Sequence, residues 1–243
     1  MDKNKGHLHP LTIIIQDMVT IFSELGFSVA FGPEIESEEN NFDLLNIPKD
    51  HPARDMWDTF FIKNEEQKVL RTHTSPVQIR YMRGKQPPFR IISPGKTFRY
   101  EATDLTHEAQ FFQLEGLIID KKTSLAELKG TLNYFLKKIF NNENIETRFR
   151  PSYFPFVEPG FEVDMSCSQC EKKGCSFCKQ TGWIELLGAG MVHPNVLKNV
   201  GLDPKKYQGF AFGVGVDRVA MLKYRIDDIR LLYQGDLRLV NQF

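Results

Sequence analysis

Side chains of types that bind ligands alternate along the stretch RYEATDLTHEAQFFQLE. Apolar residues before and after a polar link predict two antiparallel strands joined by a long loop. Since successive strand side chains point to opposite faces, Arg99 and Glu101 would share one face of the first strand. By the same rule, Phe111, Gln113 and Glu115 would share one face of the second strand. Such a surface is costly to bury without partners, which favours a polar ligand site, with a solvated sheet face as the alternative.

Four cysteines form a second group with ligand-binding chemistry, in the pattern C-x2-C-x4-C-x2-C. They are Cys167, Cys170, Cys175 and Cys178. Two C-x2-C pairs with no cysteine left over predict a structural zinc site, because four protein ligands leave no open position for catalysis. Strands expected at 161–165 and 183–187 would put residues 166–182 at a hairpin tip. The alternatives are disulfides, which a reducing cytosol disfavours, an iron–sulfur centre, or a cluster without metal.

The elements that must position these groups follow from hydrophobic periodicity. Apolar residues at helical spacing predict helices over 11–25 and 125–140, and a last helix, 216–224, follows the Gly-rich strand 209–215. Shorter elements are expected at 27–31, 57–62 and 69–72 (strands), and at 38–46 and 76–83 (helices, the second with Ser75 as its cap). The order helix, strands, helix, strands, helix predicts an α+β fold, with a mostly antiparallel sheet flanked by helices.

Composition limits the class of protein. The 243 residues and 41% hydrophobic content suffice for one large domain, and we expect a single domain over 1–243. Lysine plus arginine equals aspartate plus glutamate at 31 each, so net charge favours no particular partner. The N-terminus MDKNKGHLHP lacks the apolar core of a signal peptide, and no apolar run approaches the ~20 residues that span a bilayer. These features predict a soluble, cytoplasmic protein without a membrane partner.

Three stretches resemble, in chain order, the motifs of class II aminoacyl-tRNA synthetases. The helix 11–25 with the strand ending at Pro33 is similar to the first motif, Phe98-Arg99-Tyr100-Glu101 to the second, and Gly213-Val214-Gly215-Val216-Asp217-Arg218 to the third. Longer strings resemble the catalytic domain of the phenylalanyl-tRNA synthetase alpha subunit family: HPARDMWDTF, RTHTSPVQIR, QFFQLEGL, RPSYFPF and GAGMVHPN. The resemblance covers nearly the whole chain and implies the class II catalytic fold.

The chain departs from the family pattern in three places. Family members usually carry an N-terminal helical arm that contacts tRNA, whereas this sequence starts just before the catalytic domain. The third motif usually has glutamate before its arginine, and here Asp217 is one methylene shorter. The cysteine cluster is present in only some members. The first departure leaves tRNA docking open, and the other two leave the chemistry intact.

The resemblance implies activation of L-phenylalanine by ATP to phenylalanyl-adenylate, followed by transfer to tRNA(Phe). Because the carboxylate attacks the α-phosphorus directly, this chemistry needs positioning and cations rather than an enzymatic nucleophile. The residues implied for catalysis and ATP binding are Arg99 (α-phosphate and carboxylate), Arg218 (γ-phosphate and adenine), His107 (phosphate), Glu101 (adenine edge) and Phe111 (adenine stacking). ATP in turn implies Mg²⁺, held mainly by the phosphates.

The amino-acid subsite has a polar and an apolar part in this resemblance. Residues implied for phenylalanine binding are Gln113, Glu115, Ser75 and His73 around the α-ammonium, and Trp57, Phe154, Phe156, Ala211 and Gly213 around the ring. Phe154 and Phe156 could grip a benzyl ring edge-on, although ordinary core packing explains the same residues.

The family also implies partners. An apolar slot discriminates against tyrosine by only roughly 10²-fold, so errors need correction elsewhere. The family's beta subunit carries that editing, and an (αβ)₂ heterotetramer is usual. Two rival functions are a non-catalytic class II paralogue acting as a binding protein, and a synthetase for another amino acid such as phosphoserine. The paralogue should have lost Arg99 or Arg218, and phosphoserine would need cations where Phe154 and Phe156 stand.

Overall fold

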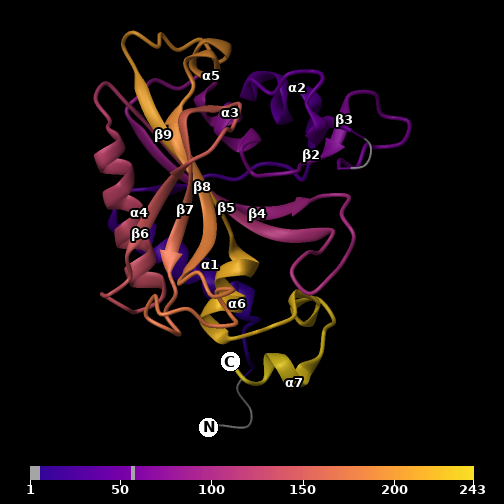
Figure 1. Ribbon diagram of the computed structural model, residues 1–243. Coiled ribbons are helices and arrows are strands. Elements are labelled where there is room, and N and C mark those ends of the chain that lie inside the picture. The colour runs from indigo at the N-terminus through magenta and orange to yellow at the C-terminus, as the bar shows by residue number, and fades with distance from the viewer. Residues whose placement is uncertain (1–5, 56–57) are drawn as a thin grey trace.

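The computed structural model describes residues 6–55 and 58–243 (Figure 1). Its elements, in chain order, are α1 (Pro10–Glu24), β1 (Ser28–Val29), β2 (Ile35–Ser37), α2 (Glu38–Asn41), η1 (Asp43–Leu45), η2 (Pro52–Arg54), β3 (Lys68–Leu70), α3 (Pro76–Met82), β4 (Phe89–Phe98), β5 (Gln110–Asp120), α4 (Leu125–Ile139), β6 (Thr147–Pro151), β7 (Val157–Ser166), β8 (Trp183–Val192), α5 (Pro194–Asn199), β9 (Gln208–Gly215), α6 (Val216–Tyr224), η3 (Ile229–Leu232) and α7 (Leu237–Val240). None of the helices in these described ranges is long and apolar enough to cross a membrane.

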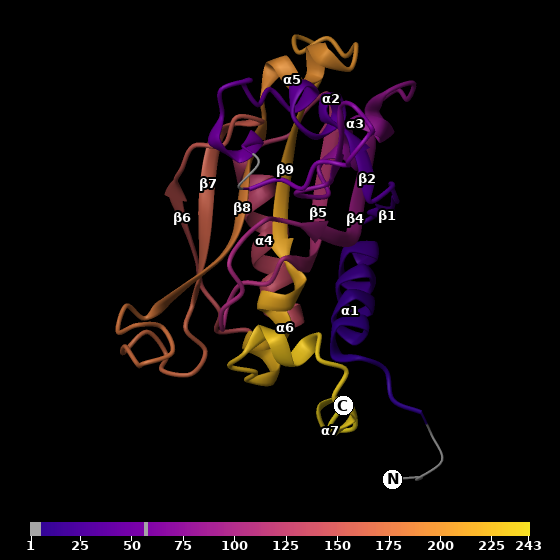
Figure 2. The ribbon, with the colours of Figure 1, turned by 90° about the vertical axis from the view of Figure 1, so that its right-hand side faces the viewer.

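A seven-stranded sheet in the order β1-β4-β5-β9-β8-β7-β6 forms the centre of the molecule. Figure 2 shows its strands side by side from β6 to β4. Only the short β1 pairs in parallel, with β4, and the other neighbours are antiparallel. β2 and β3 form a separate two-stranded sheet. The α+β class with a mostly antiparallel sheet is therefore confirmed.

Successive side chains of the central strands point to opposite faces of the sheet, so the core is divided into two clusters, one on each face. Even-numbered residues of β9, such as Phe212 and Val214, pack with α1, α4 and α6 in the larger cluster. Odd-numbered residues, such as Ala211, face a second cluster that includes Leu45 of η1 and Val77 of α3. In Figure 1, α4 lies on one side of the sheet, and α2 with the β2–β3 pair on the other. The odd-numbered face is the face on which polar residues gather.

Local sequence signals explain why the long helices form where they do. The N-terminal residue of α1 is Pro10, and His9 caps the helix by accepting the Leu11 N–H on Nδ1 at 3.2 Å. Ser124 Oγ accepts the Glu127 N–H at 3.2 Å at the start of α4. The Glu127 carboxylate pairs with Arg90 at 3.2 Å, so it completes a salt bridge between α4 and β4.

Several boundaries differ from the sequence predictions. β4 ends at Phe98, so Arg99 and Glu101 lie in the following loop rather than on one face of a strand. The strand expected at 27–31 is reduced to the two residues of β1, and the helix expected at 38–46 is split into α2 and η1. Of the strand expected at 57–62, the structure shows an isolated bridge from Phe61 to Val69. Helix α5 was not predicted.

Candidate functional site

A cavity of about 680 Å³ opens over β5, β9 and β8, on the face of the sheet that carries Glu115 and Gly213. Ten of the residues singled out from the sequence line it: His73, Ser75, Arg99, Glu101, Gln113, Glu115, Phe154, Phe156, Ala211 and Gly213. Register explains this convergence, because Glu115 of β5 pairs with Gly213 of β9, and Gly213 pairs with Gly188 of β8. The polar residues of β5 thus lie beside strands that carry little side-chain bulk.

The Glu115 carboxylate lies at the polar end of the cavity and is 5% exposed. Its Oε2 accepts hydrogen bonds from Ser75 Oγ at 2.5 Å and from Gln78 Nε2 at 2.7 Å. Burial raises the pKa of Glu115 to about 7, against the opposing effect of these two donors and of Arg99. The carboxylate is therefore poised to gain or lose its charge near neutral pH, and a cation bound beside it would favour the charged form.

Two further polar groups in this cavity lack partners. Both ring nitrogens of His73 and the Oε1 atom of Gln113 are buried without a hydrogen bond to any residue that the structure describes. Burial and the charges of Arg99 and Arg71 lower the pKa of His73 to about 3, so its imidazole is neutral at physiological pH. Buried acceptors without partners are costly in a folded protein, which indicates a ligand that donates hydrogen bonds here.

An aromatic slot adjoins these polar groups. The ring centroids of Phe154 and Phe156 are 6.1 Å apart with their planes tilted by 32°, and the His73 ring lies 6.2 Å from Phe156. A Cβ added at Gly188 would come within 3.1 Å of the Phe154 ring, and one at Gly213 within 2.9 Å of Gln113 Nε2. The two glycines therefore leave room that a side chain would fill.

Arg99 supplies positive charge on the same cavity. Its Nε donates to the Thr72 carbonyl at 3.1 Å, and its guanidinium carbon lies 5.0 Å from the centroid of the Phe111 ring. Burial lowers the pKa of Arg99, while the acids Glu101, Glu115 and Asp58 oppose this effect. Since a guanidinium stays protonated in proteins, a half-buried cation lines the cavity.

Three of the predicted residues are not in the cavity lining. His107 lies exposed in the β4–β5 loop, where its Nδ1 is 3.0 Å from Asp104 Oδ1. Arg218 is an exposed residue in the first turn of α6, and Phe111 borders the cavity through its contact with Arg99. Trp57 falls outside the described residues. The structure thus brings the predicted amino-acid subsite together more completely than the predicted phosphate contacts.

Gln78 is a cavity residue that the sequence interpretation missed. It lies on α3, is 7% exposed and donates to Glu115. Ser75 precedes that helix, yet its side chain caps nothing and bonds to Glu115 instead, so the predicted capping role is wrong. The signal was available: Ser75 and Gln78 are three positions apart, a spacing that puts both on one helix face.

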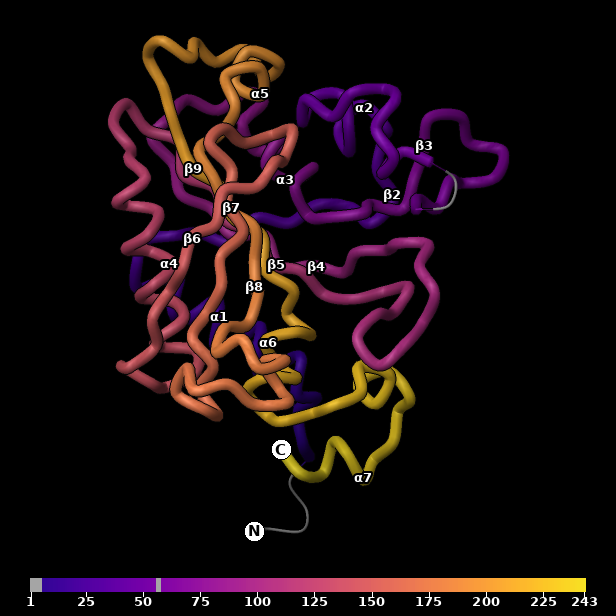
Figure 3. The backbone as a smooth tube through the Cα atoms, in the orientation of Figure 1, coloured from indigo at the N-terminus to yellow at the C-terminus, as the bar shows by residue number. Residues whose placement is uncertain are grey.

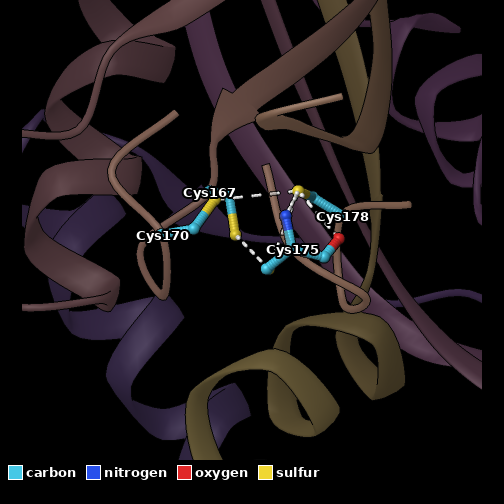
Figure 4. A group of neighbouring side chains, drawn as sticks. All are labelled: Cys167, Cys170, Cys175 and Cys178. Atoms are coloured by element: carbon cyan, nitrogen blue, oxygen red, sulfur yellow. Dashed lines mark hydrogen bonds between the residues drawn. The ribbon is translucent and has the colours of Figure 1, made fainter. Parts of the chain in front are cut away.

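The four cysteines converge at the end of the β7–β8 hairpin, as predicted (Figure 4). Their sulfur atoms all lie within 4.8 Å of one another, and the closest pairs are 3.7 and 3.8 Å apart. A tetrahedral zinc ion with Zn–S bonds of about 2.3 Å separates its ligands by about 3.8 Å. These distances are far longer than a disulfide bond of about 2.05 Å. The cluster therefore has the size of a four-thiolate metal site.

The structure combines an antiparallel sheet flanked by helices with a half-buried arginine and acid–amide groups at one cavity, as expected for a class II aminoacyl-tRNA synthetase core. The family model for "tRNA synthetases class II core domain (F)" matches residues 1–243, and the chain belongs to this family. It is 57% identical over 238 residues to the phenylalanine–tRNA ligase alpha subunit of Syntrophus aciditrophicus (strain SB). The corresponding proteins of Clostridium beijerinckii and Caldanaerobacter subterraneus are 56% and 54% identical over the same length. Each match covers 98% of this chain and 69% of the relative.

Proposed function

We propose that this chain is the catalytic alpha subunit of a phenylalanine–tRNA ligase. It activates L-phenylalanine with ATP to phenylalanyl-adenylate and then transfers the amino acid to tRNA(Phe). The observation that carries the proposal is one cavity that combines an aromatic slot, buried acceptors around Glu115 and the cation Arg99. An aromatic amino acid needs each of these three features, and the relatives' names agree with this specificity.

The polar end of the cavity would hold the α-ammonium group. Glu115 offers a carboxylate, and Gln113 Oε1 is an acceptor without a partner among the described residues. Ser75 donates its one hydroxyl hydrogen to Glu115, so its oxygen lone pairs stay free to accept. His73 is neutral and adds ring nitrogens that need partners. Phe154 and Phe156 would then contact the benzyl ring, while Ala211 and Gly213 leave space for it.

The adenylate step requires two anions to approach each other. Arg99 would bind the α-phosphate and the attacking carboxylate, since its planar guanidinium suits forked contacts to oxygen anions. Arg218, in the first turn of α6, would bind the γ-phosphate, Phe111 would stack on the adenine, and Glu101 would read its edge. Positioning and charge neutralisation supply the rate enhancement, because the carboxylate itself is the nucleophile.

Additional parts of the proposal concern metal, partners and location. Mg²⁺ would accompany ATP, with ligands chiefly from the phosphates. His107 bonds to Asp104 through Nδ1, and its Nε2 would contact a phosphate. We infer that residues 1–243 act as one catalytic domain with residues 166–182 as an insertion, in the cytoplasm. A beta subunit in an (αβ)₂ heterotetramer, tRNA(Phe) and the correction of tyrosine errors on the beta subunit complete the expected system.

We also infer that the four cysteines hold a structural zinc ion. The sulfur separations of 3.7 and 3.8 Å support a tetrahedral ion. The backbone N–H groups of Cys175 and Gly182 each donate to Cys178 Sγ at 3.2 Å, as expected for a sulfur that carries negative charge. The two residues that directly follow each C-x2-C pair both have positive φ: Glu171 and Lys172 after the first pair, and Lys179 and Gln180 after the second. Both pairs thus make the same tight turn, which a shared metal would stabilise.

Amino-acid-dependent ATP–pyrophosphate exchange tests the proposal. The chain would be assayed alone and with the beta subunit, across all twenty amino acids. We expect exchange with phenylalanine, weak exchange with tyrosine, and loss of both in Arg99→Gln. Folded protein without exchange in either format would instead support a non-catalytic paralogue, and a preference for phosphoserine would overturn the specificity.

A further inference from the structure

Residues 229–233, which we call the C-terminal strap, join segments that border the proposed ATP site. Ile229 and Leu232 are 4% and 3% exposed and belong to the larger core cluster, so the strap is anchored. Figure 3 shows this stretch of chain beside the loop between β4 and β5. No residue of the strap is among those that line the cavity.

One attachment of the strap is made through Asp217, a buried acid with 2% exposure. Strand β9 ends at Gly215, which pairs with Gln113 of β5. Phe112, the residue before Gln113, therefore has no partner in β9. Asp217 Oδ2 takes the place of a strand by accepting the Phe112 N–H at 2.6 Å. Its other oxygen, Oδ1, accepts the hydroxyl hydrogen of Tyr233. The strap, the start of α6 and β5 are thereby joined at one carboxylate.

This carboxylate stands between residues with proposed roles. Along the chain it precedes Arg218, and its bond to Phe112 falls between Phe111 and Gln113 on β5. Any shift of Asp217 would therefore change the distance between the arginine on α6 and the ring on β5. Burial raises the pKa of Asp217 to about 6, which leaves it largely ionised at neutral pH and able to accept both bonds.

The strap has a second attachment at the β4–β5 loop. Ile229 N–H donates to the Leu105 carbonyl at 3.0 Å, although Leu105 itself is exposed. Arg230 pairs with Asp228 at 2.7 Å and also lies close enough to Asp104 and Glu108 for their charges to raise its pKa. The acidic loop therefore meets a cationic residue of the strap. A third contact, from His9 Nε2 to the Leu232 carbonyl at 2.9 Å, ties the strap to the start of α1.

We propose that Tyr233 and Asp217 are positioning residues for ATP binding. The Tyr233–Asp217 bond fixes the start of α6, and so Arg218, relative to β5, while Ile229 fixes the β4–β5 loop. The proposal rests on the function proposed above, because it assigns ATP to this side of the site. The C-terminal segment would set the ATP-binding geometry by holding Asp217 and the β4–β5 loop in place.

Tyr233→Phe is the main test, because it removes one hydroxyl and keeps the ring, and Asp217→Asn is the second variant. Tyr134→Phe is a matched control, since Tyr134 also donates to a carboxylate, Glu24 Oε2 at 2.6 Å, between α4 and α1. The full chain with its beta subunit would be assayed by pyrophosphate exchange. Because a hydrogen bond to a charged group is lost, we expect KM for ATP to rise about fivefold or more in Tyr233→Phe. KM for phenylalanine should change less than about twofold, and Tyr134→Phe should change neither.

Hydrogen exchange of the loop amides in the chain without ligands provides a readout that does not depend on activity. We expect amides of residues 103–109 to exchange faster in Tyr233→Phe than in the wild type or in Tyr134→Phe. Unchanged KM for ATP together with unchanged loop exchange would overturn the inference, even if the melting temperature fell. If the wild type showed no phenylalanine-dependent ATP–pyrophosphate exchange, the proposed function would fail. The strap would then be judged by loop exchange and by the affinity for a non-hydrolysable ATP analogue.

Discussion

Ser75 donates its hydroxyl hydrogen to Glu115 Oε2 at 2.5 Å, and this bond joins the start of α3 to the centre of the sheet. Gln78, one turn further along α3, donates to the same oxygen at 2.7 Å. Neither of these two side chains therefore occupies Glu115 Oε1. The protein thus holds this carboxylate through Oε2, in a residue that lines the cavity.

Phenylalanine binding should weaken as pH falls below about 7. The pKa of Glu115 is raised to about 7 by burial, so the carboxylate gains a proton as pH drops through this value. Only the ionised form attracts the α-ammonium, and each pH unit below the pKa should therefore raise KM for phenylalanine about tenfold. Pyrophosphate exchange between pH 6 and 8, with saturating ATP, measures this. Glu115→Gln should bind weakly with little pH dependence; a flat wild-type profile would contradict the assignment.

Gly213→Ala should impair amino-acid binding selectively. The added Cβ would lie 2.9 Å from Gln113 Nε2 and 3.2 Å from Glu115 Cγ, which requires both side chains to move. Displacing these two side chains weakens their hydrogen bonds to the α-ammonium, and a loss of about 1–3 kcal/mol of binding free energy is equivalent to a rise of about 5- to 150-fold in KM for phenylalanine.

Gly130→Ala is the matched control for that substitution. Gly130 lies on α4, and a Cβ there would meet nothing within 4 Å. Its kinetics should equal those of the wild type, and its helix should gain stability of about 1 kcal/mol. Equal kinetic effects in the two variants would show that the space at Gly213 is irrelevant to the ligand.

Tyrosine should be activated by this chain at a measurable rate. Phe154, Phe156 and Val157 form apolar walls of the cavity, so a phenolic hydroxyl is opposed mainly by its desolvation. Such a slot discriminates by roughly 10²-fold in kcat/KM. Steady-state exchange with each amino acid gives the ratio directly. Discrimination beyond about 10⁴ would require a polar contact that rejects the hydroxyl, and would remove the reason to place correction on a second subunit.

The purified protein should contain about one zinc ion per chain. Cys175→Ser should lose the metal and lower the melting temperature, since the ion holds together both halves of the 166–182 insertion. Ser176→Ala is the control, as Ser176 is exposed and lies between two ligands. Elemental analysis and the absorption spectrum of cobalt-substituted protein provide the measurements. Metal well below one equivalent in protein prepared without chelators, or no tetrahedral cobalt–thiolate spectrum, would refute the site.

Periodicity predicted α1 and α4 well because the apolar spacing and the end signals of these helices are local. Helix α5 was missed since its six residues are too few to show a period. Likewise, nothing in the sequence marks the end of β4 at Phe98. Arg99 nevertheless reaches the cavity, because the loop turns there and its Nε bonds to the Thr72 carbonyl.

The candidate site likewise contains some groups that the sequence could identify and others that it could not. The cysteines could be grouped from spacing alone, because all four lie within twelve consecutive residues. Gln78 could not be paired with Glu115, since helix and strand meet only through the tertiary fold. The Tyr233–Asp217 bond could not be predicted for the same reason: Asp217 lies on α6, 16 residues before Tyr233, and the tertiary fold brings the two side chains together.

The order of strands has a consequence for synthesis of the protein. β5 lies in the middle of the sheet beside β9, yet about a hundred residues separate Gln113 from Gly215 in the chain. While the ribosome makes the intervening residues, one edge of β5 has no partner strand. The cavity also lacks its β9 residues, Ala211 and Gly213, during this time. Such long-range pairing folds slowly and exposes strand edges that invite aggregation. The nascent chain should therefore depend on chaperones until β9 emerges and closes the sheet.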